Sequence, residues 1–317
     1  LNMTRAALIP YAIKGWELWN NTEKWLFGGV GTRKVNGLSL AFTEEEEELL
    51  FKRVEARQAM GAPIKFISGR KAQLLEPGLN DSVRSAAWCN KDGFTIAYLT
   101  GHAFRRALKQ ENVSVREYSK VNKIEIEKNY FKIIFENNEH LKAKRIVLAG
   151  GVWLEEMLNW LNVKIKIKCL INQLIITERM PPVMKTVLSI ANGLLSLKQF
   201  DNGTVLIGGG WQGIGDKKRG GVESIPENLI GNIRLACHVI PKLRYGRMVR
   251  VWLGLEAETA DALPIIGKIP GISNAYVIGS VHSGYASGPY MGWLLSQLIM
   301  EQEPEMPLFD PNRLINK

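Results

Sequence analysis

Apolar residues recur along the N-terminal third of the chain with spacings that predict alternating helices and strands. Tryptophan and leucine residues spaced among polar ones over residues 13–27 predict an amphipathic helix. Residues 34–42 read as a strand, and Thr43 follows it with Glu46 three positions later. That spacing is typical of a capping box, so we expect a helix that begins after Thr43 and continues to about Met60.

The middle of the chain changes from helix to strand patterns several times. A short apolar strand is predicted at 85–88, a break at 92–93 and a helix at 97–110. Alternating segments at 120–137 predict a hairpin, and the apolar run within 145–151 ends in a glycine turn. This order favours a parallel sheet with an inserted β-meander, and ligands are expected beyond the ends of its strands.

A third region has the short alternating runs of an antiparallel sheet. Residues 164–168 alternate strictly, and residues 194–210 predict a hairpin that turns at 201–203. A helix is predicted at 227–239 and a further strand at 247–252. We therefore expect a mainly antiparallel substrate domain inserted into an α/β cofactor domain.

The C-terminal region predicts a strand, a loop and a helix bounded by glycines. The strand covers 275–279, the loop 280–285, and the helix is expected to open at Gly288-Pro289. Such a junction directs backbone N–H groups and the positive end of a helix at one place, which suits an electron-rich, partly anionic group.

Composition and charge narrow the class of protein. A chain of 317 residues is long enough for two domains, and 46% hydrophobic with 23% charged residues is ordinary for a globular enzyme. The net charge of +10 is scattered, without the Lys/Arg-rich block that marks a nucleic-acid surface. We expect a solvated basic surface and no nucleic-acid partner.

Cysteine and histidine usage argues against disulfides and metals. Cys89, Cys169 and Cys237 are too far apart for a CxxC pair or a disulfide framework, which favours a reducing, cytoplasmic location. The four histidines lack metal-ligand spacing, so no metal is expected. The longest apolar runs, such as residues 292–300, are too short to span a bilayer, so no transmembrane segment is expected.

Several motifs, in order along nearly the whole chain, carry a family resemblance. Together they resemble the D-amino-acid oxidase-like (glycine and sarcosine oxidase-like) family of FAD-dependent oxidoreductases. Residues 260–267 match its Pro-Asp-x-x-Pro-x-x-Gly signature except for the first proline. The other matching segments are Glu76-Pro77-Gly78-Leu79, Asp92-Gly93, Ala149-Gly150-Gly151-Val152-Trp153 and Asn172-Gln173.

The resemblance implies an α/β fold in which a Rossmann-like FAD-binding domain is interleaved with an α+β substrate domain on a mainly antiparallel sheet. It assigns residues 1–32, 94–163 and 253–317 to the FAD-binding domain and residues 33–93 and 164–252 to the substrate or cap domain.

One part of the family pattern is missing from the sequence. The family begins with a βαβ unit whose Gly-x-Gly-x-x-Gly turn holds the FAD pyrophosphate, and no such turn is present. Gly208-Gly209-Gly210 is no substitute, because a tryptophan and a β pattern follow it. Roughly 40–50 further residues before Leu1 would complete the unit. Either they precede the given sequence in a longer chain, or the protein has lost the dinucleotide site.

The resemblance also implies which residues contact FAD. The loop from Gly279 would lie along the flavin ring, where His282 would stabilise negative charge on the reduced ring or orient the substrate, unless it only bonds its own loop. No cysteine stands at the family's place for a covalent flavin link, so non-covalent FAD is implied. The implied cofactor-binding residues are Arg5, Ala6, Ala7, Leu8, Val121, Ala149, Gly150, Trp153, Gly279, Ser280, Val281, His282, Ser283, Gly284 and Tyr285.

Glu256 marks a departure from many amino-acid oxidases of this kind. It stands where they carry an arginine that clamps the substrate carboxylate. A carboxylate at this position would repel that group. Glu256 therefore either pairs with a substrate ammonium, which would make it a catalytic-site residue beside His282, or forms a structural ion pair.

The activity that the resemblance implies is oxidation of a C–N bond in an amine or amino-acid derivative, by hydride transfer to the flavin. The small-molecule substrate and the electron acceptor stay open, and some relatives act as subunits of multi-subunit dehydrogenases. The alternative is a non-catalytic structural or assembly subunit that retains the fold.

Overall fold

The computed structural model describes residues 1–217, 221–280 and 284–315, and the chain forms two compact units. Unit 1 comprises Leu1–Phe104 and Ile171–Gly254, and unit 2 comprises Arg105–Leu170 and Leu255–Lys317. The sequence predicts a cofactor domain and a substrate domain, which are defined by the ligand that each binds. The two compact units are defined by packing alone, so the predicted domain bounds stay a prediction. Residues 1–32 belong to the compact unit 1.

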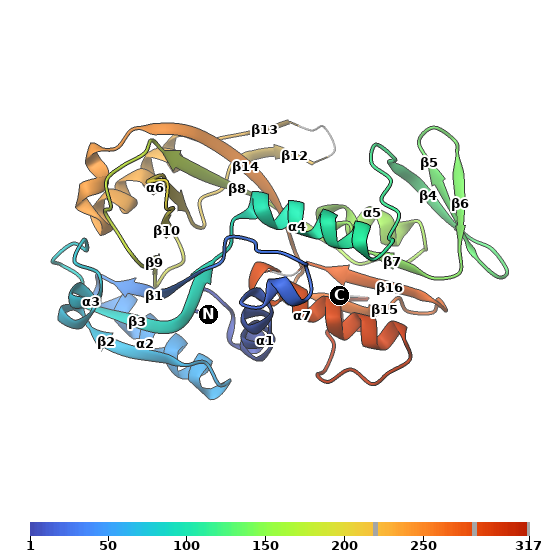
Figure 1. Cartoon of the computed structure of the whole chain (residues 1–317), viewed down its shortest axis with the longest axis horizontal. Coiled ribbons are helices and arrows are strands. Elements are labelled where there is room, and N and C mark those ends of the chain that lie inside the picture. The colour runs from blue at the N-terminus through green and yellow to red at the C-terminus, as the bar shows by residue number, and fades with distance from the viewer. Residues whose placement is uncertain (218–220, 281–283, 316–317) are drawn as a thin grey trace. The chain divides into compact units, whose positions relative to one another are not determined.

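Unit 1 is built on an eight-stranded sheet (Figure 1). Strand β1 pairs in parallel with β9 and antiparallel with β3, and the pairings of β2, β10 and β11 are also antiparallel. The mainly antiparallel sheet expected from the short alternating runs is confirmed. Its strands are, in spatial order, β14 (Met248–Glu258), β8 (Lys168–Thr177), β11 (Val205–Gly208), β10 (Ser196–Gln199), β9 (Val187–Ile190), β1 (Arg33–Ala41), β3 (Ser85–Phe94) and β2 (Ile64–Ser68).

Hydrophobic clusters lie on both faces of this sheet. On one face, inward residues of consecutive strands, such as Leu38, Leu188 and Leu197, pack with side chains of α3 (Gly69–Leu75) and α6 (Pro226–Val239). On the other face, α2 (Glu44–Ala59) covers only the β1–β3–β2 end, through a second cluster that includes Leu50 and Ala87. Side chains alternate between the two faces along each strand. The side chains of β9, β10 and β11 that point away from the first cluster therefore belong to neither cluster.

Local signals placed several of these elements correctly. The Thr43 hydroxyl accepts the Glu46 N–H at 3.2 Å, and the Glu46 carboxylate accepts the Phe42 N–H at 2.9 Å, which confirms the cap. The hairpin turning at residues 201–203 and the helix predicted at 227–239 are also present, as β10–β11 and α6.

The first predicted helix is misplaced at both ends. It is α1 (Ile9–Trp19), preceded by the 3₁₀ turn η1 (Ala6–Leu8) and followed by η2 (Thr22–Lys24). The side chains of Asn20 and Asn21 donate to backbone carbonyls one turn earlier, at 2.7 and 2.8 Å. Asparagine side chains that bond the backbone in this way compete with the helical ladder and end the helix before its predicted limit.

The break predicted at Asp92-Gly93 is wrong. Strand β3 runs through it to Phe94, because β1 begins early enough to pair Arg33 with Phe94 and Val35 with Asp92. A β-bulge between Val35 and Gly37 absorbs the irregularity. Helix α4 (Ala97–Gln110) follows as expected.

Unit 2 contains a small mixed sheet and a separate meander. Strand β16 (Ala275–Gly279) lies between β15 (Ile265–Lys268) and β7 (Ile146–Leu148), parallel to β7. The antiparallel meander β4 (Val121–Ile126), β5 (Phe131–Phe135) and β6 (His140–Ala143) precedes β7 in sequence (Figure 1). The expected meander is present, but the sheet is mixed instead of parallel, since β15 pairs antiparallel with β16. The other elements of unit 2 are η3 (Gly151–Trp153), α5 (Leu154–Asn159), α7 (Gly284–Ile299) and η5 (Pro311–Leu314), and those of unit 1 are β12 (Ile214–Asp216), β13 (Gly221–Glu223) and η4 (Pro241–Tyr245).

Two further expectations are corrected in detail. Residues 164–168 alternate in burial, with Ile165 and Ile167 buried, but β8 begins only at Lys168. The Ile167 N–H donates to the Glu155 carboxylate at 3.2 Å instead of to a strand. Helix α7 contains Pro289 instead of opening there, and this proline removes one N–H donor from the hydrogen-bond ladder of the helix.

Candidate functional site

The parallel pairing of β7 and β16 brings two predicted cofactor-binding turns to the same edge of the unit 2 sheet. Ala275 pairs with Ile146 and Val277 with Leu148, so the strands run in the same direction to one edge, and β16 continues two residues beyond the last pair, to Gly279. Ala149-Gly150 follows β7, and β16 ends at Gly279 and is followed by Ser280. In α/β sheets this is the edge beyond which ligands bind.

The glycines of these turns allow close packing by the helix that follows β7. A Cβ added to Gly279 would lie 2.2 Å from Leu154 Cδ1, and one added to Gly150 would lie 2.2 Å from Met157 Sδ. Leu154 and Met157 both belong to α5. A larger residue at either position would force the Leu154 or Met157 side chain to shift, so glycine suits the close packing of α5 against this edge.

Ser280 has an unusual conformation for a residue other than glycine. Its φ of 52° lies in the left-handed region, and the residue is only 4% exposed. Its Oγ is buried and has no hydrogen-bond partner among the residues that the structure describes. A strained residue with an unsatisfied buried hydroxyl is a feature that clusters at ligand sites.

Two aromatic side chains flank the same region with large exposed surfaces. Trp153, at the end of η3, is 48% exposed, and Tyr285, in the first turn of α7, is 52% exposed. Val121, another predicted contact, begins β4 and is half-buried against the unit 2 core. Exposed aromatic rings beside a strand edge suit a flat heterocyclic ligand.

Part of the predicted loop lies outside the described residues. This concerns Val281, His282 and Ser283, while Gly284 is the first described residue of α7. The role assigned to His282 therefore stays a prediction.

Glu256 lies on β14 and faces away from the unit 2 core. Its neighbours Leu255 and Ala257 pack into that core, and Glu256 is half-buried. Alternation along the strand places its carboxylate on the opposite side. Its part in substrate binding stays a prediction.

The predicted contacts Arg5, Ala6, Ala7 and Leu8 belong to unit 1. Arg5 and Ala7 are exposed, Ala6 is half-buried, and Leu8 is fully buried, so contact of these residues with a cofactor stays a prediction.

Arg57, which the sequence analysis did not single out, bonds the backbone at Thr4, directly before these predicted contacts. Arg57 of α2 donates from Nε to the Thr4 carbonyl at 2.8 Å, and burial lowers the pKa of its guanidinium to about 10. In the sequence Arg57 resembles any surface arginine of an amphipathic helix, so no local signal identifies it.

The signature at residues 260–267 forms a tightly bonded turn. The Asp261 carboxylate accepts the Thr259 hydroxyl at 3.0 Å and the Leu263 N–H at 3.1 Å, while Ala262 adopts a φ of 56°. Arg313 donates to the same carboxylate from Nε at 2.8 Å. The aspartate of the motif therefore shapes the turn before β15.

The residues of the unit 2 edge fit a flavin cofactor. Gly150 and Gly279 let α5 pack closely at the strand ends, the Ser280 hydroxyl is available to a polar atom, and the two exposed aromatic rings provide apolar surface. These are the group types that hold FAD in proteins, in which the chain supplies position and electrostatics.

A comparison with family models decides the relationship. Residues 2–298 match the model described as FAD dependent oxidoreductase (DAO). The chain belongs to the DAO family of FAD-dependent oxidoreductases. FAD is therefore its cofactor, and the family resemblance found in the sequence motifs is confirmed.

Curated relatives of this DAO-family chain include two oxidases. An opine oxidase subunit from Rhizobium meliloti is 26% identical over 261 residues, which cover 80% of this chain and 67% of the relative. Glycine oxidase of Geobacillus kaustophilus (strain HTA426) is 22% identical over 294 residues, covering 91% and 76%.

Solved structures confirm the fold. Glycine oxidase from Geobacillus kaustophilus has a TM-score of 0.87 at 20% identity, and L-proline dehydrogenase from P. horikoshii has a TM-score of 0.87 at 24% identity. Each comparison covers 98% of this DAO-family chain and 83% of the solved chain.

Residues 1–217, 221–280 and 284–315 contain no group of three metal-ligating side chains. Within the same ranges, each helix is too short or too polar to cross a bilayer.

Proposed function

We propose that this protein oxidises a C–N bond of an amine or amino-acid derivative, with FAD as the hydride acceptor. The observation that carries the proposal is the sheet edge formed by the ends of β7 and β16. Ser280 follows Gly279 at this edge, with a left-handed backbone conformation and a buried hydroxyl that has no hydrogen-bond partner among the described residues. The names of the relatives, an opine oxidase subunit and a glycine oxidase, support the substrate class.

In this proposal the chain contributes position, exclusion of water and hydrogen bonding. Gly150 and Gly279 allow α5 to pack against the strand ends that would hold the cofactor, and the Ser280 hydroxyl would bond one of its polar atoms. Trp153 and Tyr285 exclude water from its apolar surface, and a dry pocket strengthens the electrostatic interactions inside it. FAD is held without a covalent bond.

The substrate must react as a neutral amine, because an ammonium has no lone pair to support loss of hydride. Its proton passes to water or to a neighbouring base before the C–H bond breaks. Glu256, which stands where related oxidases carry an arginine, pairs with the ammonium form and positions the nitrogen. His282 orients the substrate or stabilises charge on the reduced cofactor.

We further propose that the protein acts with partner subunits in the cytoplasm. The subunit role is supported by the likeness to an opine oxidase subunit. The location is supported by the three free cysteines Cys89, Cys169 and Cys237.

Anaerobic titration tests the proposal. The protein expressed from its complete reading frame is mixed with FAD, freed of excess cofactor and titrated with a panel of amines and amino acids. We expect a yellow protein whose flavin absorption bleaches with at least one compound. A preparation that takes up no FAD, or whose flavin no panel member reduces, would instead favour a structural role.

A further inference from the structure

Strand β14 is an edge strand of the unit 1 sheet. In the part of the chain that the structure describes, β8 is its neighbour on one side and no strand pairs with its other side. Arg247, directly before β14, bonds toward β8: its carbonyl accepts the Glu178 N–H at 2.8 Å, and its own N–H donates to the Glu178 carboxylate at 3.1 Å. Backbone groups alternate in direction along a strand, so those of Met248 and Arg250 point to the free edge.

Apolar side chains are exposed at this edge. Tyr245, Met248 and Val249 are 79%, 51% and 66% exposed. Met248 and Val249 are consecutive, so they point to opposite faces of the strand, and neither face is covered there. Sheet edges are usually protected by short strands or by proline, whereas β14 has 11 residues and contains no proline. A long, apolar, unpaired edge is a template for a further strand.

Cations without ion-pair partners accompany the apolar side chains. Residues 242–250 include four lysine or arginine residues and no acidic one. Lys242, Arg247 and Arg250 are exposed, and none of them forms an ion pair with a described residue. Opposite charges on neighbouring strands stabilise their pairing, and like charges oppose it. The edge is therefore complementary to an extended segment that carries carboxylates.

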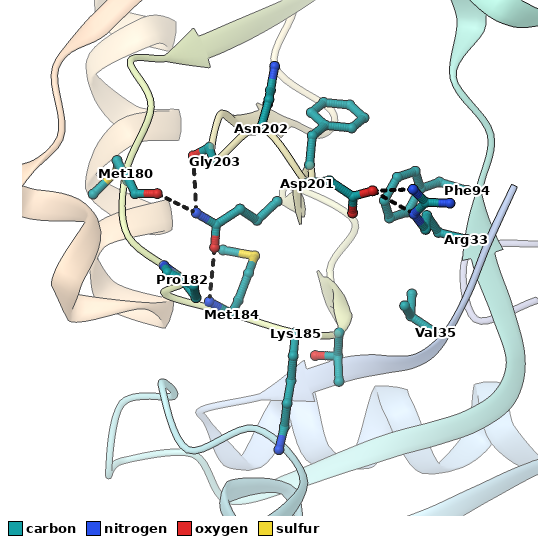
Figure 2. Close-up of a pocket in the computed structure, with 13 residues that line it drawn as sticks. Arg33, Val35, Phe94, Met180, Pro182, Met184, Lys185, Asp201, Asn202 and Gly203 are labelled. Atoms are coloured by element: carbon teal, nitrogen blue, oxygen red, sulfur yellow. Dashed lines mark hydrogen bonds and ion pairs between the residues drawn. The ribbon is translucent and has the colours of Figure 1, made fainter. Parts of the chain in front are cut away.

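The turn before β14 is held in place by the adjacent loop. A Cβ added to Gly246 would lie 2.5 Å from Met180 Sδ. The Met180 N–H donates to the Gly203 carbonyl at 3.0 Å, and the Met180 carbonyl accepts the Gln199 amide at 3.4 Å, beside a cavity of about 380 Å³ (Figure 2). An edge that is ordered before binding lowers the entropy cost of adding a strand.

Two other occupants fit this edge less well. A second copy of the chain in a two-fold contact would set the edge against itself, so Arg247 and Arg250 would face the same cations. A nucleic acid would use the cations but would leave the row of backbone groups and the exposed Met248 and Val249 without a matching partner.

We propose that β14 binds an acidic, extended segment of a partner subunit as an additional strand. Arg247 and Arg250 pair with its carboxylates, Met248 and Val249 contact its apolar side chains, and the free backbone groups of β14 complete the pairing. The inference rests on the proposed role with partner subunits and assigns that role a surface within unit 1.

Fluorescence anisotropy with a designed peptide tests the proposal. The probe is a fluorescein-labelled peptide of about nine residues in which glutamate and valine alternate, added to the FAD-loaded protein from its complete reading frame. We expect saturable binding. Arg247→Glu combined with Arg250→Glu should raise Kd at least about 10-fold, because carboxylates then meet carboxylates. Arg70→Glu combined with Lys71→Glu is the matched control and should leave Kd unchanged, since both residues are exposed on α3.

A second peptide separates strand pairing from simple charge attraction. It has the same side chains, but each backbone nitrogen is methylated, so it has no backbone N–H to donate. Its Kd for the wild type should be at least about 10-fold higher. Equal binding of the two peptides, or equal binding by the wild type and the charge-reversed variant, would overturn the docking edge. Displacement of the peptide by a single-stranded oligonucleotide of the same length, or a wild-type dimer that the variant dissociates, would also overturn it.

Flavin reduction in the same samples keeps the two proposals apart. If a compound bleaches the flavin but the peptide does not bind, the oxidation stands and the docking edge is wrong. If the peptide binds as expected but no compound bleaches the flavin, the docking edge stands and the oxidation is wrong.

Discussion

Arg313 and Asp261 form a bidentate ion pair in unit 2, with Nε–Oδ2 at 2.8 Å and Nη2–Oδ1 at 3.3 Å. The same guanidinium donates to the carbonyl of Leu263 at 3.1 Å and to that of Pro264 at 2.6 Å. Arg313 thus fixes both the carboxylate and the backbone of the turn that precedes β15. The aspartate of the family signature is a structural residue in this arrangement.

Replacing Asp261 with Asn should lower the free energy of unfolding by about 1–2 kcal/mol at neutral pH, because the charged pair and its shared hydrogen bonds are weakened. Thermal or urea unfolding measures this loss. Asp81→Asn is the matched control, since Asp81 is exposed and accepts a single side-chain bond from Gln73 at 3.3 Å. Equal effects of the two substitutions would contradict the structural role.

The same carboxylate predicts a pH dependence. Burial by itself would raise the pKa of Asp261, but hydrogen bonds from Arg313, the Leu263 N–H and the Thr259 hydroxyl outweigh it and hold the pKa below its ordinary value. The stabilisation is therefore complete above the unfolded pKa of about 3.9 and is lost as pH falls through the lower folded value. The stability difference between wild type and Asp261→Asn should shrink as the pH falls below about 4.

Gly279→Ala should disturb the cofactor edge, because the new methyl group would meet Leu154 Cδ1. We expect a loss of about 1–3 kcal/mol in unfolding free energy and weaker FAD retention, measured by flavin absorbance after dialysis. Gly288→Ala is the control, since nothing lies within 4 Å of its added Cβ. That substitution should leave FAD retention unchanged. Full FAD retention in Gly279→Ala would contradict the placement of the cofactor at this edge.

Arg57→Ala should loosen the segment that carries Arg5–Leu8. The substitution removes the donor to the Thr4 carbonyl and opens a cavity, and the expected cost is about 2–3 kcal/mol. Amide hydrogen exchange at residues 4–8 should accelerate more than exchange in the hairpin β10–β11. Uniform acceleration across unit 1 would show that Arg57 supports the whole unit instead of this segment.

Thiol labelling should distinguish the cysteines. Cys89 is fully buried, and burial raises the pKa of its thiol to about 11, whereas Cys237 is half-buried with a pKa that burial also raises. Since the thiolate is the reactive form, Cys89 should be alkylated by iodoacetamide only when the protein unfolds. Mass spectrometry across a urea series measures this. Labelling of Cys89 in the native protein at the rate of Cys237 would contradict its burial.

What the sequence determined by itself was local. The Thr43–Glu46 cap, the Asn202-Gly203 turn, the helix α6 and the strand β16 depend on residues a few positions apart, and each was predicted from its own residue types and spacing. The family motifs added the fold and the cofactor, because each motif records a backbone geometry that its residues must adopt.

Tertiary structure decided what depends on distant partners. Asp92 and Gly93 lie in β3 only because β1 reaches back to pair with them, and residues 164–167 lack a strand partner despite their alternation. Arg313, which lies 52 positions from Asp261, carries no local signal of its position. Hydrophobic periodicity specifies which side of an element is buried. Packing between segments far apart in the chain decides which strands pair and which charged groups meet a counter-ion.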